Sequence, residues 1–256
     1  MMRKITQIVF VMFVSMVLIQ AALADDLSNV KQKGEITMAM SGQYPPFNFV
    51  NDQNKVTGFD VEIGQEIAKR IGVSGTPVTT AWDGIIAGLL ANKFELICGS
   101  MAITEARLKS IDFSEPYYRS GAQLFVKKGS LLTSVKDLAG KKIGVTLGTT
   151  YEKWVRENLS SVDIRTYKGE PDMFLEIANG RIDGIITDKI VGILAIKEKN
   201  IQIQLAGDLL YEEKMGIALR KGNDSLKKVI NQALVSIKED GTYNKISMKW
   251  LGTDVR

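Results

Sequence analysis

Residues 82–107, WDGIIAGLLANKFELICGSMAITEAR, carry the clearest local indication of how this chain folds. Apolar residues at helical spacing predict a helix over residues 83–91, and the apolar run 94–98 predicts a buried strand. Thr104, just beyond that strand, is a good N-cap for a further helix. A helix, a buried strand and a new helix in this order are typical of α/β proteins.

Arg107 lies in the first turn of that further helix. A cation at this position faces the positive end of the helix dipole, which costs roughly 0.3–1 kcal/mol. An anion held by both the helix N-terminus and the guanidinium group would remove the conflict, because both groups donate hydrogen bonds to it. Arg107 directed into solvent is the alternative, and this segment alone does not distinguish the two.

Strand-like and helix-like segments continue to alternate on both sides of this stretch. Upstream, residues 36–40 and 77–80 predict strands, and residues 61–71 predict a helix that stops at Gly72. Downstream, we expect strands over residues 123–127, 142–146, 164–167, 183–187 and 214–220. We expect helices over residues 150–159, 171–179, 190–197, 225–239 and 243–250, and a short turn or helix over 134–138. The repeated βαβα order predicts mostly parallel sheets with helices on both faces.

The same order predicts two lobes of similar size. One lobe is expected to combine residues 25–119 with 219–256, and the other to comprise residues 120–218 with the crossover strands. No low-complexity linker separates the two units, so we expect the crossover strands to act as a hinge.

The first 24 residues predict an export signal. Arg3 and Lys4 precede a mostly apolar segment over residues 5–23, and small residues around Ala24 form a cleavage site. An uncleaved membrane anchor is the alternative, and the polar residues that interrupt the apolar segment disfavour it. We therefore expect a mature periplasmic protein that begins at residue 25.

Composition excludes several classes of function. The chain has 33 Lys and Arg against 29 Asp and Glu, and loss of Arg3 and Lys4 would leave a net charge of +2. That balance gives no indication of a nucleic-acid partner. Because the chain has no histidine, His-containing catalytic triads and histidine-ligated metal sites are excluded. Cys98 is the only cysteine, so it cannot form an internal disulfide, and we expect it in the core.

Seven further motifs follow one another along the mature chain: YPPF (44–47), GFD (58–60), WDG (82–84), GKKIGVTLGTT (140–150), GRIDG with a following TD (180–188), DGTY (240–243) and KWLG (249–252). Together with SMAITEAR, they resemble the polar amino-acid-binding proteins of bacterial ABC importers, the family 3 solute-binding proteins. The resemblance covers essentially the whole mature chain and implies an α/β, two-lobed periplasmic-binding-protein fold of type II.

The resemblance also implies how the carboxylate of a free amino acid would be held. Arg107 would bind the α-carboxylate through two hydrogen bonds. Backbone N–H groups at Ala102 and at Thr150, with Thr149 beside it, would complete the anion site from the two lobes.

The other half of the ligand would meet a second set of residues. By resemblance, Asp188 and the backbone carbonyl of Ser100 would hold the α-ammonium group, and Tyr44 and Trp82 would enclose the ligand side chain, with Ser41 as a polar contact. Both charges of a zwitterion must be paired when water is excluded, because an unpaired buried charge costs several kcal/mol. A ligand that bridges two lobes would therefore favour their closed arrangement.

Most of these residues also have a purely structural interpretation. Asp188 lies between a strand and a helix and could simply be an N-cap, as could Thr149 or Thr150 for the helix that follows. Tyr44 and Trp82 could be ordinary half-buried aromatic residues.

Two positions depart from the family pattern. Ala102 stands where many relatives have a Ser or Thr hydroxyl for the carboxylate, which predicts weaker carboxylate binding, compensation by a threonine, or an unusual ligand. Ser41 stands where receptors for cationic amino acids often have an acid, which disfavours a strict arginine or lysine receptor. Gln43 and Thr146 are candidate polar contacts, and Asp60 is expected to cap its helix although it could face the pocket.

The resemblance therefore implies a monomeric receptor for a neutral polar amino acid, glutamine-like or cystine-like, that delivers its ligand to the membrane subunits of an ABC permease without a cofactor. Three alternatives remain: a cationic amino-acid receptor, a sensor domain, and a prephenate or arogenate dehydratase on the same fold. The dehydratase would need a general acid, for which Glu152 and Glu170 are candidates without a distinguishing motif.

Overall fold

The computed structural model describes residues 26–256, so the predicted export signal lies outside the described residues. No helix in this part of the chain is long and apolar enough to cross a membrane. The central feature is one long mixed sheet with strand order β10-β9-β11-β8-β12-β6-β1-β5, to which β7 is added through β12. A separate small antiparallel sheet has the order β2-β3-β4.

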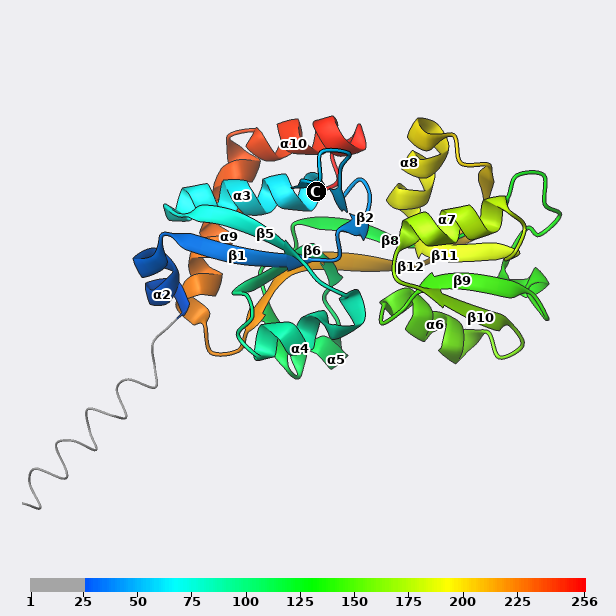
Figure 1. Cartoon of the computed structure of the whole chain (residues 1–256), viewed down its shortest axis with the longest axis horizontal. Helices are drawn as coiled ribbons and strands as arrows, with labels where there is room; N and C mark the ends of the chain where they lie inside the picture. Colours follow the sequence, from blue (N-terminus) through cyan, green and yellow to red (C-terminus); the bar gives the residue numbers. More distant parts are fainter. Residues whose placement is uncertain (1–25) are drawn as a thin grey trace, which may run out of the picture.

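The first lobe surrounds one end of this sheet. Its strands are β1 (Glu35–Met40), β5 (Ser74–Thr79), β6 (Leu96–Ala102) and β7 (Ile111–Phe113), and the small sheet consists of β2 (Gln43–Tyr44), β3 (Asn48–Val50) and β4 (Val56–Thr57). Its helices are α2 (Asp26–Lys33), α3 (Phe59–Ile71), η2 (Trp82–Gly84), α4 (Ile85–Leu90), α5 (Glu105–Leu108), α9 (Asp224–Glu239) and α10 (Thr242–Leu251). β1 pairs in parallel with both β5 and β6. α3 and α10 lie on one side of these strands, and α4 and α5 lie on the other (Figure 1).

The second lobe surrounds the other end. Its strands are β9 (Lys142–Thr146), β10 (Asp163–Tyr167) and β11 (Gly184–Asp188), and its helices are η3 (Val135–Asp137), α6 (Thr150–Asn158), α7 (Glu170–Ala178) and α8 (Lys189–Lys199). β9 pairs in parallel with β10 and β11. Helices again cover both faces, with α7 and α8 opposite α6 (Figure 1). The prediction of α/β lobes with helices on both faces is confirmed.

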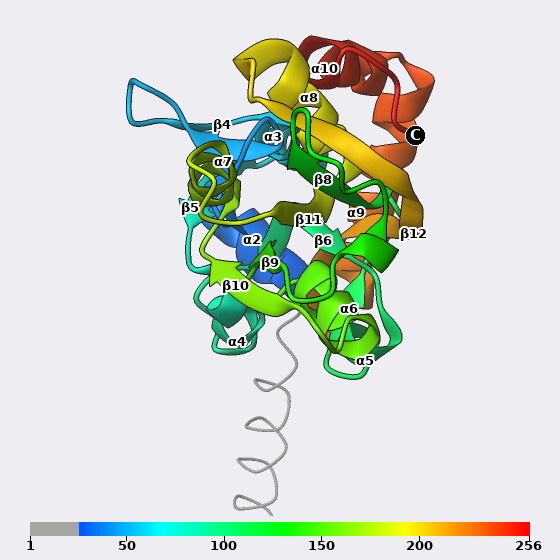
Figure 2. The ribbon, with the colours of Figure 1, turned by 90° about the vertical axis from the view of Figure 1, so that its right-hand side faces the viewer.

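Two antiparallel strands connect the lobes. β8 (Tyr118–Lys127) and β12 (Ile203–Arg220) pair along most of their length, with a register shift between Ala206 and Tyr211. β8 continues into the second lobe by pairing with β11, whereas β12 continues into the first by pairing with β6 and β7. Figure 2 views the molecule from the second-lobe end. The protein is a two-lobed α/β protein whose lobes share these strands.

β12 is much longer than the predicted strand over residues 214–220. Its first part is rich in polar residues, among them Gln204, Asp208 and Glu212, and has no regular alternation of apolar and polar positions. Pairing with β8 supplies the backbone hydrogen bonds that hold this part extended. A local pattern could not have predicted it, because the stabilising partner is far away in sequence.

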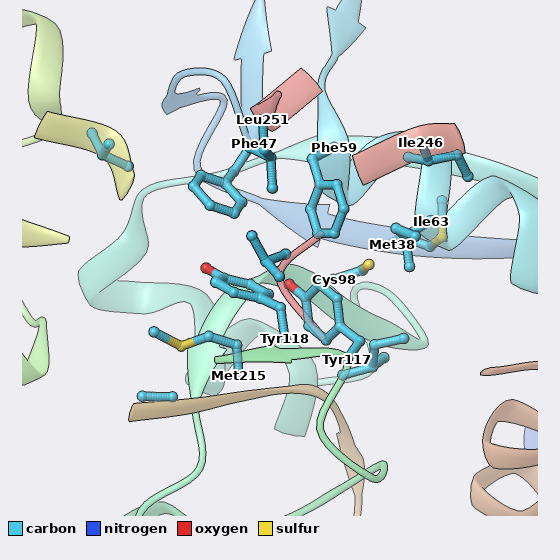
Figure 3. Close-up of a cluster of buried hydrophobic side chains, with 14 of the residues drawn as sticks. Met38, Phe47, Phe59, Ile63, Cys98, Tyr117, Tyr118, Met215, Ile246 and Leu251 are labelled. Carbon is cyan, nitrogen blue, oxygen red and sulfur yellow. The ribbon is translucent and has the colours of Figure 1, made fainter. Parts of the chain in front are cut away.

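An aromatic cluster packs the first lobe against the connecting strands. Phe47 stacks on Tyr118 with ring centroids 4.9 Å apart, and Phe59 stacks on Tyr117 at 6.1 Å (Figure 3). All four rings are fully or almost fully buried. Cys98 is buried beside them, which confirms that it is a core thiol. The cluster therefore anchors the start of β8, where the chain leaves the first lobe.

Asp60 belongs to this core, and the expectation that it caps its helix was wrong. The N-cap of α3 is Gly58, and Asp60 lies inside the helix. Its carboxylate accepts hydrogen bonds from Tyr117 Oη at 2.7 Å, from Asn48 Nδ2 at 2.7 Å and from Ser100 Oγ at 2.9 Å. Burial raises the pKa of Asp60 to about 6, although these three donors act in the opposite direction. Tertiary partners thus satisfy an acid that the local sequence assigned to a cap.

Candidate functional site

A cavity lies between the two lobes and contains most of the predicted site. It has about 440 Å³ of empty space, open solvent included. Eight of the predicted site residues line it: Ser41, Tyr44, Trp82, Ser100, Ala102, Arg107, Thr149 and Thr150. The ninth, Asp188, does not. These eight residues come from six separate segments of the chain, so only the fold brings them together.

Arg107 is the only described guanidinium that lines the cavity. The Thr104 side chain accepts a hydrogen bond from the Arg107 backbone N–H at 3.2 Å, which confirms Thr104 as an N-cap. Arg107 Nη1 donates to the Ala102 carbonyl at 2.8 Å, and its guanidinium carbon lies 5.9 Å from the Trp82 ring centroid. Burial lowers the pKa of Arg107. Arg107 is half-buried, and it is in none of the ion pairs among the described residues, so its guanidinium group is available to an anionic ligand.

The second lobe faces Arg107 with the start of α6. The Thr149 side chain caps that helix by accepting a hydrogen bond from the Glu152 backbone N–H, and Thr149 Oγ1 donates to the Thr146 carbonyl at 2.6 Å. Thr150 is the first residue of α6 and also lines the cavity. Helix N-termini carry free N–H groups that bind anions. α5, by contrast, is a single turn, so the guanidinium group of Arg107 is the main positive feature of the first lobe.

Ser41 and Ser100 are held in place by a shared polar network. Asn48 Oδ1 accepts from Ser41 Oγ at 3.1 Å, and the Asn48 amide donates to Asp60. Asp60 in turn accepts from Ser100 Oγ, and the Ser100 backbone N–H donates to Tyr117 Oη at 2.8 Å. Ser100 has φ of 59°, a left-handed conformation that is uncommon outside glycine. The buried Asp60 network therefore fixes a strained backbone at the wall of the cavity.

Asp188 ends β11 behind the cavity wall and acts as the N-cap of α8. Its Oδ1 accepts from Ser120 Oγ at 2.8 Å and from the backbone N–H groups of Ile190 and Val191 at 2.7 and 3.4 Å. Tyr151 Oη lies 3.5 Å from the other oxygen, Oδ2. Burial raises the pKa of Asp188 to about 7. The structural interpretation of Asp188 thus holds in this structure, and its ligand-binding role stays a prediction.

Six further residues line the cavity: Gly99, Thr146, Tyr151, Lys168, Glu170 and Glu213. Of these, the sequence analysis named Thr146 as a candidate polar contact and Glu170 as a candidate acid. Glu170 accepts from Thr146 Oγ1 at 3.1 Å and from Thr187 Oγ1 at 3.2 Å, and burial raises its pKa to about 7. Lys168 directly follows β10, and residues at the carboxyl ends of parallel strands often meet ligands, which was a usable signal. Glu213 had no such signal, because it lies in the unpredicted part of β12.

Comparison with known proteins identifies the class. The model of the bacterial extracellular solute-binding proteins, family 3, matches residues 36–253. The chain belongs to this family. A similar relative is the L-cystine-binding protein TcyJ of Escherichia coli strain K12, 40% identical over 231 residues that cover 90% of this chain and 87% of the relative. The putative ABC transporter arginine-binding protein 2 of the same strain is 35% identical over 239 residues. The alignment covers 91% of this chain and 98% of the relative.

Solved structures agree with the family. A P235GK mutant of ArgBP from T. maritima superposes with a TM-score of 0.84 at 33% identity, covering 89% of this chain and 99% of that one. The ancestral amino acid-binding protein AncCDT-1, described as a precursor of cyclohexadienyl dehydratase, superposes with a TM-score of 0.83 at 35% identity, covering 88% and 99%. The two relatives from Escherichia coli are both named as binding proteins.

Proposed function

We propose that the protein is a periplasmic receptor that captures a free amino acid by closure of its two lobes and delivers it to an ABC-type permease. The observation that carries this proposal is the cavity between the lobes, where the half-buried Arg107 guanidinium forms no ion pair among the described residues. The lobes would comprise residues 25–119 with 219–256 and residues 120–218, and β8 and β12 would act as the hinge.

Each charged group of an amino acid would find a complementary group in this cavity. Arg107, with N–H groups at Ala102 and Thr150, would bind the α-carboxylate, and Thr149 would hold the start of α6 in place. The α-ammonium group would approach the acidic side chains on the opposite wall. The negative charge of Asp188 behind that wall would also attract it. The carboxylate would therefore touch both lobes, which is how a ligand favours their closed arrangement.

The lining supports a ligand without net charge. It contains two bases, Arg107 and Lys168, and two acids, Glu170 and Glu213. A ligand with one ammonium group and one carboxylate at each of its ends would neutralise all four of these side chains. L-Cystine is a ligand of this kind. The similarity to an L-cystine-binding protein agrees with this choice. L-Glutamine is the other neutral candidate, with Ser41 and Thr146 available to its amide.

A dehydratase is the second candidate because one acid in the cavity could donate a proton near neutral pH. Glu170 is that acid, with a pKa raised to about 7 by burial. Glu152, the other acid considered, pairs instead with Arg156 and is not among the residues that line the cavity. AncCDT-1, a precursor of cyclohexadienyl dehydratase, links this fold to such an enzyme.

Thermal unfolding of residues 25–256 against a ligand panel tests both functions. The panel contains L-cystine, L-glutamine, L-arginine, L-histidine, prephenate and arogenate. A ligand that binds only the folded state stabilises it by about 2.7 kcal/mol at a hundredfold excess over its Kd. We expect L-cystine to raise the midpoint most. No shift with any amino acid would contradict the receptor, and release of phenylpyruvate from prephenate or of phenylalanine from arogenate would establish the enzyme.

A further inference from the structure

A single buried carboxylate holds two segments of the cavity wall. Asp60 lies near the start of α3 and is completely buried. Its Oδ1 accepts a hydrogen bond from Tyr117 Oη, and its Oδ2 accepts from Ser100 Oγ and Asn48 Nδ2. Asn48 Oδ1 in turn accepts from Ser41 Oγ at 3.1 Å. Ser41 and Ser100 line the cavity, so the network joins one buried acid to two positions on the wall.

The two wall segments come from the ends of neighbouring strands. Ser41 directly follows β1, and Ser100 lies near the end of β6. β1 and β6 pair in parallel, so their carboxyl ends lie at the same edge of the sheet, where ligands of α/β proteins bind. Asn48 also fixes the start of the first segment, because its Oδ1 accepts from the Gly42 backbone N–H at 3.0 Å. The network therefore determines how both strand ends meet the cavity.

Ser100 is the wall position that depends most on this network. Its φ of 59° is unfavourable for a residue with a Cβ atom and costs glycine nothing. Such a conformation persists only where the surrounding structure holds it. The Ser100 N–H donates to Tyr117 Oη at 2.8 Å, and Ser100 Oγ donates to Asp60 at 2.9 Å. Because Tyr117 Oη itself donates to Asp60, both restraints on Ser100 end at the same carboxylate.

The residues that hold Ser100 cannot act by touching a ligand. Asp60 and Tyr117 are both 0% exposed, and neither is among the residues that line the cavity. We propose, on the basis of the amino-acid receptor proposed above, that Asp60 and Tyr117 are positioning residues that hold Ser100 in its left-handed conformation before the ligand arrives. A wall that is already in the binding conformation does not have to be ordered by the ligand. Without the network, the wall would adopt that conformation for only a fraction of the time, and affinity would fall by that fraction.

Tyr117→Phe is the test variant, because it removes only the hydroxyl group that joins Ser100 to Asp60. Tyr243→Phe is the matched control, since Tyr243 is equally buried and packs against Phe59, but donates its hydroxyl to the Tyr117 carbonyl instead. L-Cystine, L-glutamine and L-arginine are each titrated by calorimetry into the parent and both variants. For each one that binds the parent, we expect Tyr117→Phe to weaken binding by about 5-fold to 100-fold relative to Tyr243→Phe.

Glycine at position 100 separates positioning from a general loss of stability. Glycine adopts a φ of 59° without steric cost, so Ser100→Gly no longer needs the network to hold this conformation. When Tyr117→Phe is added to Ser100→Gly, we expect it to weaken binding by less than about threefold. An equal loss of affinity in the Ser100 and Ser100→Gly backgrounds overturns the positioning role, as do equal affinities of Tyr117→Phe and Tyr243→Phe.

Ser100→Ala tests the same role without a change in the core. Ser100→Ala and Ser100→Gly both remove the hydroxyl group, but only alanine keeps a Cβ atom that is strained at this φ. We expect Ser100→Ala to bind the amino acid more weakly than Ser100→Gly, and binding at least as tight as that of Ser100→Gly overturns the proposal. A parent protein that binds none of the three amino acids overturns the receptor function as well.

Discussion

Gly169 lies where the two lobes touch, so a single methyl group there should oppose their closed arrangement. Gly169 precedes α7 in the second lobe, and Gln43 belongs to β2 in the first, directly beside α7 (Figure 1). A Cβ atom at Gly169 would lie 2.5 Å from Gln43 Cβ and 2.7 Å from the Gln43 carbonyl oxygen. The backbone of Gly169 is extended, with φ of −172°, so alanine is not strained there by its own conformation.

The size of the effect follows from these contacts. Ordinary contacts begin at 3.4 Å, so Gln43 and residue 169 must separate by about 1 Å, and neither atom is the end of a flexible side chain. Overpacking of this kind costs about 1–3 kcal/mol. Under the proposed closure of the lobes, the contact between Gln43 and Gly169 would be lost when the lobes open, so we expect Gly169→Ala to weaken ligand binding by about 5-fold to 150-fold. Faster dissociation should account for most of the loss.

Calorimetry and stopped-flow dissociation measure this effect, and Gly84→Ala is the control. A Cβ at Gly84 meets nothing within 4 Å, and its φ of −104° suits alanine. Thermal unfolding without ligand should be nearly the same for both variants, because the lobes themselves are unchanged. Equal affinities and dissociation rates in Gly169→Ala and Gly84→Ala would refute the reasoning.

Three further predictions concern the cavity itself. Arg107→Ala should weaken amino-acid binding at least about 30-fold without unfolding the protein, and unchanged affinity by calorimetry would contradict the assigned carboxylate site. Trp82 fluorescence should change on ligand binding, and a flat signal in a protein that binds by calorimetry would place the ligand elsewhere. Burial raises the pKa of Glu170 above that of an unfolded glutamate, although the Thr146 and Thr187 hydroxyls lower it, so the folded state holds the proton more tightly. The free energy of unfolding should therefore fall as pH rises from about 5 to 8, less steeply in Glu170→Gln, and identical slopes would contradict this.

Local sequence patterns predicted the regular elements of both lobes. The helix α3 and the strand β9 lie close to where apolar periodicity placed them, because each buries one apolar face that repeats in the sequence. The patterns missed α2, the three-stranded small sheet and the first part of β12. These segments are short or mixed in polarity, and they depend on partners that are distant in the chain.

Three acids show which features of the site the sequence could not predict: Asp60, Asp188 and Glu213. The motifs around Arg107 and Trp82 were sufficient to identify two residues that line the cavity, because a helix cap and a family motif are local features. Whether an acid finds hydrogen-bond donors is not a local property. Asp60 accepts from Tyr117 and Asn48, and Asp188 accepts from its own helix and from Ser120. No donor among the described residues reaches Oε2 of Glu213. The chain alone determined which residue types are available, and only the packing of two lobes across β8 and β12 decided which carboxylate oxygens are paired, because burial and hydrogen bonding depend on every element that surrounds a group.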